Sequence, residues 1–111
     1  MKKIKIYVGD TDFSDKLSKR IWKDPERFAD QYTIVVPPEL FSKVFTKERL
    51  RLLKALEKKP KNMGELTEML KRPREAVSRD MSYLAGMGIV DVEKNGKERI
   101  PTRAGEISVS M

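Results

Sequence analysis

The alternation of apolar and polar residues predicts one strand near each end of the chain and another between them. Isoleucines alternate with lysines in KKIKIYV near the N-terminus, and apolar residues alternate with serines in GEISVSM, which ends at Met111. A period of two is typical of a half-buried strand. A third apolar run, QYTIVV, stops at Pro37-Pro38. We expect strands at about residues 3–8 and 32–36 and in the last segment. They should form a small sheet, within one chain or shared between two, because a lone strand leaves its edge unpaired.

Apolar residues three or four positions apart predict a helix after the first strand. Phe13, Leu17 and Ile21 recur every four residues, and either Thr11 or Asp12 is a good N-cap for the helix that carries them. A further helical turn should follow in PERFAD, with its proline at the first position.

Three more helices are expected between Pro38 and the turn at Lys71-Arg72. Pro38 can open one, Thr46 resembles the N-cap of a second, and Asn62 begins a third with Glu65 at a capping-box-like spacing. The last two helices should turn their leucine-rich sides to a core, formed by Leu52, Leu53, Leu56, Leu66, Met69 and Leu70.

A further helix follows a tight turn at Lys71-Arg72. Pro73 suits its first position, and Gly86 or Gly88 suits its end. At about 100° per residue, residues 74–87 separate into two faces. Val77, Met81 and Leu84 should point inward, and the outward face is small and polar, with Glu75, Ser78, Arg79, Ser82 and Gly86.

IVDVEKNGKERIP, residues 89–101, predicts a β-hairpin directly after this helix. Asn95-Gly96 suits a two-residue type I′ turn between short strands. A helix, a turn, a second helix with a polar face and then a hairpin form the sequence pattern of a winged helix-turn-helix.

The predicted fold class is therefore α+β. We expect a winged helix-turn-helix, with a three-helix core and a β-hairpin wing, at residues 38–101. A strand-helix-strand extension at residues 1–37 should serve assembly or dimerisation, and residues 102–111 should form a C-terminal strand.

Composition narrows the functional classes. The chain has 111 residues, a net charge of +7 and a pI near 9.7, which favours polyanionic partners such as nucleic acid. It has no cysteine or histidine, which excludes disulfides, thiol nucleophiles, Ser-His-Asp catalysis and His-ligated zinc. We expect a cytoplasmic protein with no enzymatic activity, no cofactor, no metal and no membrane span, since no apolar run approaches the roughly 20 residues that a span needs. The Lys, Arg and Glu content with a single Gln is typical of thermophile proteins.

Basic and polar side chains around the second helix of the motif are the candidate DNA contacts. Arg79 could pair with guanine or grip a phosphate, while Ser78 and Ser82 could contact bases or phosphates. Glu75 is better explained by the positive N-terminus of its helix, and Asp80 by an ion pair with a nearby Arg or Lys. The remaining candidates would hold the DNA backbone: Lys71, Arg72 and Arg74 at the helix N-terminus, and Lys94, Asn95 and Lys97 in the wing, with Arg99 as a further possibility.

The stretch from MGELTEML to EKNG resembles the DNA-binding module of many prokaryotic winged-helix regulators. Ser78-Arg79-Asp80 and the LAGMGIV ending of residues 84–90 carry that likeness. Over most of its length the chain also resembles a family of small archaeal and bacterial winged helix-turn-helix regulators that place a strand and a helix before the motif. Their Thr-led helix corresponds to residues 46–50, whereas the link at residues 102–105 departs from their pattern. The resemblance implies DNA binding and regulation.

Three functional readings remain open. The first is a transcriptional regulator that binds a palindromic double-stranded DNA site as a homodimer, with the helix of residues 74–86 in the major groove and the wing of residues 90–100 on the flanking backbone. The second is the DNA-binding antitoxin of a toxin-antitoxin pair, in which Trp22 and Phe28 would contact the toxin. The third is a protein-interaction module of a basal transcription assembly, which would have little need for a basic turn around the helix N-terminus.

Overall fold

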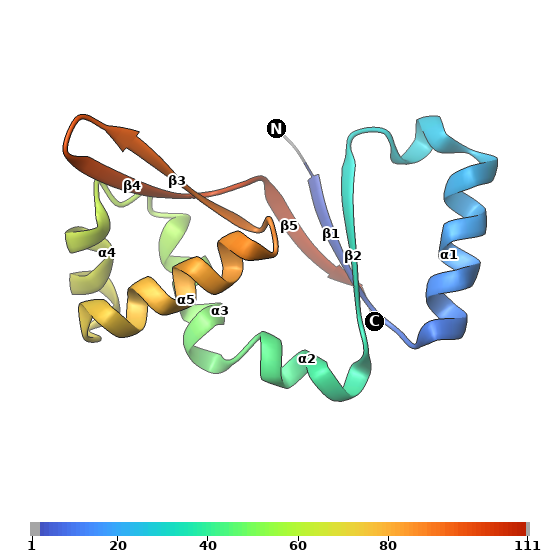
Figure 1. Ribbon diagram of the computed structural model, residues 1–111, viewed down its shortest axis with the longest axis horizontal. Coiled ribbons are helices and arrows are strands. Elements are labelled where there is room, and N and C mark those ends of the chain that lie inside the picture. Colours follow the sequence, from blue (N-terminus) through green and yellow to red (C-terminus); the bar gives the residue numbers. More distant parts are fainter. Residues whose placement is uncertain (1–2, 111) are drawn as a thin grey trace. The chain divides into compact units, whose positions relative to one another are not determined.

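The chain forms two compact units. The computed structural model describes residues 3–110 and is α+β (Figure 1). One unit combines the residues up to Val44 with those from Gly105 onward, and the other is the stretch Phe45–Ala104 between them. The expected limits lay between residues 37 and 38 and between residues 101 and 102. Residues 38–44 instead group with the N-terminal part, as does the C-terminal strand, and residues 102–104 group with the second unit. Met111, expected in that strand, lies outside the described residues.

The first unit is built around a parallel sheet. Its elements are β1 (Lys3–Val8), α1 (Thr11–Lys23), the short 3-10 helix η1 (Pro25–Phe28), β2 (Gln31–Val36), α2 (Pro38–Val44) and β5 (Glu106–Ser110). The strand order is β2-β1-β5, and β1 pairs in parallel with both neighbours. The three strands predicted from the alternating pattern are thus confirmed, and they pair within one chain.

Helix α1 begins one residue earlier than its predicted caps imply. Its N-cap is Asp10, whose Oδ1 accepts a hydrogen bond of 2.9 Å from the backbone N–H of Phe13. Thr11 and Asp12, the expected caps, are the first two helical residues. The sequence offers three capping residues in a row, and the choice among them depends on where the chain leaves β1.

The two faces of the sheet differ in polarity. Ile4 and Ile6 lie on one face and are fully buried, with exposed fractions of 0%. The opposite face, here called the polar face, carries the side chains that alternate with them. From the strand registers, it comprises Lys3, Lys5 and Tyr7 of β1, Gln31, Thr33 and Val35 of β2, and Glu106, Ser108 and Ser110 of β5.

The second unit contains three helices and a hairpin. They are α3 (Lys47–Leu56), α4 (Met63–Leu70), α5 (Arg74–Gly86), β3 (Val90–Asn95) and β4 (Glu98–Arg103). The predicted N-caps are confirmed, since Thr46 Oγ1 accepts from Arg49 N at 3.2 Å and Asn62 Oδ1 accepts from Glu65 N at 2.9 Å. Five of the six predicted core residues of α3 and α4 are buried, whereas Met69 is only half-buried.

The turn between α4 and α5 places Pro73 outside the helix. Lys71 ends α4 in the left-handed conformation, with φ 52°, and Pro73 is the N-cap of α5 with an extended ψ of 140°. The prediction that Pro73 is the first helical residue was therefore wrong by one position. The predicted end of the helix at Gly86 is confirmed, and Gly88 follows with a positive φ of 79°.

The β3–β4 hairpin also turns one residue later than predicted. Asn95 pairs with Glu98, so the two-residue loop is Gly96-Lys97 and not Asn95-Gly96. Gly96 has φ 66°, while Lys97 is not among the residues with positive φ. A positive φ at the first central residue alone is the type II′ arrangement, whereas the predicted type I′ turn needs it at both.

Candidate nucleic-acid interface

Helix α5 has one buried and one exposed side. Val77, Met81 and Leu84 have exposed fractions of 0 to 2%, which confirms the predicted inward face. Of the residues predicted to point outward, Ser78 is half-buried, and Glu75, Arg79, Ser82 and Gly86 are exposed; Arg74, Tyr83 and Ala85 of α5 are exposed as well. Arg79 is exposed, with the small Ser78 and Ser82 beside it, so its guanidinium is accessible to a partner.

Asp80, next to Arg79, is the centre of an ion-pair network in the second unit. Its carboxylate accepts from Arg49 Nε at 3.2 Å and from Arg72 Nη1 at 2.7 Å. Its side chain is only 14% exposed. The network thereby joins α3, the α4–α5 turn and α5, and the prediction that Asp80 anchors a nearby basic residue is confirmed.

Glu48 extends this network on the surface of α3. It lies 3.4 Å from Arg72 Nε and accepts from Arg51 Nη1 at 2.9 Å. Arg51 in turn donates to the carbonyl of Leu70, the last residue of α4, at 3.3 Å. Arg72 therefore has two carboxylate partners, so a phosphate contact is not needed to explain a basic residue at this position.

Arg49 and Tyr83 border Arg79. The guanidinium carbon of Arg49 lies 3.8 Å from the centre of the Tyr83 ring, a cation–π contact. Arg49, Arg72, Asp80, Tyr83 and Arg79 line a shallow pocket of about 290 Å³ together with Ala76. Sequence reasoning assigned no role to Arg49 or Tyr83, because Arg49 and Asp80 are 31 residues apart and no local pattern pairs them.

A second pocket, of about 420 Å³, brings the hairpin loop to the start of α4 and α5. Arg74, Lys97 and Arg99 line it with Glu98 and residues 62–64. Asn62 Nδ2 donates weakly to Glu98 Oε1 at 3.5 Å. Arg74 and Lys97, both predicted DNA contacts, thus share one concave surface, and Arg99 joins them.

The other predicted contacts lie on separate parts of the surface of the second unit. Lys71 is exposed at the end of α4, and Lys94 and Asn95 are exposed near the end of β3. Arg74 and Arg79 form no ion pair with a carboxylate anywhere in residues 3–110. Within the described residues, the second unit therefore exposes these two arginines, which pair with no carboxylate. Arg79 lies on the exposed side of α5, and Arg74 lies in the pocket at the start of α4 and α5.

The fold and this surface define a small α+β protein that exposes arginines on α5 and basic residues on its hairpin. The chain belongs to the HVO_A0114 family, whose model matches residues 44–109, more than half of its length. No curated protein matches the chain. Within residues 3–110, no helix is both long and apolar enough to traverse a lipid bilayer.

Proposed function

We propose that this protein is a transcriptional regulator that binds specific sequences in double-stranded DNA. In this proposal the second unit is a winged helix-turn-helix, in which α4, its turn and α5 form the motif and β3–β4 is the wing. The main support is the exposed side of α5, where Arg79 lies beside Ser78 and Ser82 and pairs with no carboxylate of residues 3–110. A helix with such a face fits a major groove about 12 Å wide.

Base reading falls to Arg79, with Ser78 and Ser82 beside it. A guanidinium can donate two hydrogen bonds to O6 and N7 of a guanine, and a serine hydroxyl adapts to a base or a phosphate. The Asp80 network restrains the helix that carries Arg79, because it ties the first half of α5 to α3 and to the preceding turn.

Contacts with the DNA backbone are assigned to the residues around the start of α5 and to the hairpin. Lys71 and Arg74 are exposed and would neutralise phosphates, which sets the register of the protein on DNA. The pocket shared by Arg74, Lys97 and Arg99 suits one phosphate of the strand that flanks the groove. Lys94 and Asn95 extend this contact along the wing.

The proposal includes a homodimer on a two-fold symmetric site. One α5 reads only a few base pairs, and two copies with half-sites about one helical turn apart lengthen the sequence that is recognised. It also assigns the protein to the cytoplasm, where prokaryotic DNA lies.

Selection of bound duplexes from a random pool tests the proposal, followed by titration of the selected site against scrambled DNA at several salt concentrations. The expected result is a palindromic preference and a steep loss of affinity with salt, because phosphate neutralisation releases counterions. Absence of any preference over scrambled duplex would refute sequence-specific binding.

Two substitutions distinguish a residue that recognises bases from one that contacts the DNA backbone. Arg79→Ala should weaken the selected site by about 1–3 kcal/mol and relax its sequence preference, whereas Lys71→Ala should weaken all duplexes alike and lower the salt slope. Lys58→Ala is the matched control, since Lys58 is exposed after α3 and lines neither pocket. If Arg79→Ala lowered the affinity equally for every DNA sequence, Arg79 would contact phosphate and not bases.

One observation favours a protein partner as a second candidate function. Trp22 of α1 is 86% exposed, although indole rings are usually at least partly covered. In the antitoxin alternative, this ring contacts a toxin encoded beside the regulator. Phe28, the other predicted contact, is half-buried in the first unit. Co-expression with the neighbouring reading frame tests the alternative, and a complex that survives Trp22→Ala unchanged would contradict it.

A further inference from the structure

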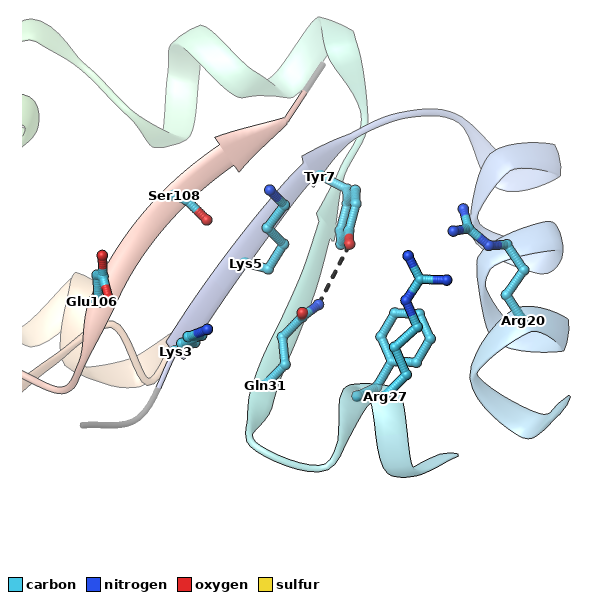
Figure 2. A pocket seen from close by; sticks show the side chains of 9 residues that line it. Lys3, Lys5, Tyr7, Arg20, Arg27, Gln31, Glu106 and Ser108 are labelled. Carbon is cyan, nitrogen blue, oxygen red and sulfur yellow. Dashed lines mark hydrogen bonds between the residues drawn. The ribbon is translucent and has the colours of Figure 1, made fainter. Parts of the chain in front are cut away.

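A pocket of about 440 Å³ lies wholly within the first unit, over the polar face of its sheet. Its walls come from β1, α1, η1, β2 and β5, as Figure 2 shows. Pockets that bind small molecules typically have volumes of about 300–1,000 Å³. The space is therefore large enough for a metabolite.

The charges that line this pocket are strongly unbalanced. Lys3, Lys5, Arg20 and Arg27 are its cations, and Glu106 is its single carboxylate. None of the four cations forms an ion pair with a carboxylate of residues 3–110. Elsewhere on α1, Lys16 does pair with Asp12, at 3.1 Å. Cations from three elements thus line one pocket, and none of them pairs with a carboxylate of residues 3–110; an anion would relieve their mutual repulsion.

The two guanidinium groups lie on the same side of the pocket (Figure 2). Arg20 extends from α1 and Arg27 from η1, and in Figure 2 both guanidinium groups lie in the space between α1 and the sheet. A planar guanidinium donates two parallel hydrogen bonds to phosphate oxygens. Lys5, half-buried on β1, adds a third charge, with its Nζ 5.7 Å from the centre of the Tyr7 ring.

Neutral groups beside the cations suit the rest of a ligand. Gln31 Nε2 donates to Tyr7 Oη at 3.4 Å and to Thr33 Oγ1 at 3.2 Å. These two bonds use both amide hydrogens, so Gln31 can offer a ligand only its carbonyl oxygen, as an acceptor. Tyr7 accepts through its oxygen, so its hydroxyl hydrogen can be donated to a ligand. The half-buried Phe28 ring supplies an apolar wall on which a flat ring can stack.

We propose that this pocket binds a small phosphate-bearing molecule with a planar ring, of the size of a nucleoside monophosphate. Arg20, Arg27 and Lys5 hold the phosphate, Gln31 accepts a hydrogen bond from the ring, and Phe28 packs against it. The site does not depend on the DNA-binding proposal, because every residue that forms it belongs to the first unit.

Calorimetric titration of the full chain tests the site with adenosine and guanosine monophosphates, inorganic phosphate and a short DNA duplex as separate probes. One nucleotide per chain should bind, more tightly than inorganic phosphate. The double variant Arg20→Gln/Arg27→Gln should weaken nucleotide binding by at least roughly tenfold, as expected from the loss of charge-assisted hydrogen bonds. Circular dichroism checks that each variant retains its fold.

Matched variants decide between the specific site and a general charge effect. Lys19→Gln/Lys23→Gln removes the same charge from α1 at exposed positions that do not line the pocket, and it should leave nucleotide affinity unchanged. Phe28→Leu should weaken the nucleotide while leaving inorganic phosphate unaffected. Equal losses in the two double variants, or no nucleotide binding, would overturn the proposal. The proposal would also be overturned if Arg20→Gln/Arg27→Gln weakened duplex binding but not nucleotide binding. That result would assign these two cations to nucleic acid.

Discussion

Replacing Asp80 with asparagine should destabilise the second unit strongly. The substitution keeps the shape of the side chain but removes the charge that accepts from Arg49 Nε and Arg72 Nη1. The pairs are largely shielded, because the side chains of Asp80, Arg49 and Arg72 are 14, 18 and 21% exposed. The uncharged amide leaves both guanidinium groups with weaker partners.

The expected loss follows from these two contacts. A hydrogen bond to a charged group contributes about 1.5–3 kcal/mol, and the guanidinium groups recover part of this through water and, for Arg72, through Glu48. We therefore expect Asp80→Asn to lower the free energy of unfolding by about 2–4 kcal/mol, a loss comparable to that of breaking a buried ion pair.

Urea unfolding followed by far-ultraviolet circular dichroism measures this effect. Asp91→Asn is the control in the same unit, because Asp91 is exposed and its side chain accepts from Val92 N, a bond that an asparagine oxygen can replace; the Asp91 carbonyl, which accepts from Thr102 Oγ1 at 3.5 Å, is unaffected. It should change stability by less than about 0.5 kcal/mol. If both variants unfolded at the urea midpoint of the parent protein, the network would not be what ties α5 to α3.

Two other substitutions test local features of the fold in the same assay. Gly9→Ala should destabilise the first unit by about 1–3 kcal/mol, because its Cβ would lie 2.5 Å from Phe13 Cδ1, whereas Gly86→Ala, with nothing within 4 Å, should be neutral or stabilising. A neutral Gly9→Ala would show that the Phe13 ring moves aside freely. Asn62→Ala should lower stability by about 1 kcal/mol by removing the cap on Glu65 N, and an unchanged midpoint would show that water replaces this cap.

Much of the fold was predictable because its signals are local. Period-two segments became β1 and β5, the apolar run QYTIVV became β2, and the spacing of Val77, Met81 and Leu84 gave the buried side of α5. The errors were shifts of one residue, at the start of α1, at Pro73 and at the hairpin loop. Each of these boundaries depends on strand pairing or on a neighbouring turn, which the local pattern does not contain.

The candidate sites were less predictable because they combine distant residues. The sequence suggested a partner for Asp80, but Arg49 lies 31 positions away and Arg72 had been assigned to phosphate. The basic pocket of the first unit was not foreseen at all. Its cations are scattered over residues 3–27, and only the parallel pairing of β1 with β2 and β5 brings Gln31 and Glu106 beside Lys3.

The central position of β1 has a consequence for how the protein is made. β5 pairs with β1 from the opposite end of the chain, with Lys3 beside Glu106, and the whole second unit is inserted between them. Contacts of such high sequence separation form late, because the loop between them must close first. During synthesis, one edge of β1 must therefore stay open until β5 has left the ribosome. Pairing of β5 with β1 then completes the sheet, and a chain truncated before β5 would expose a strand edge prone to aggregation.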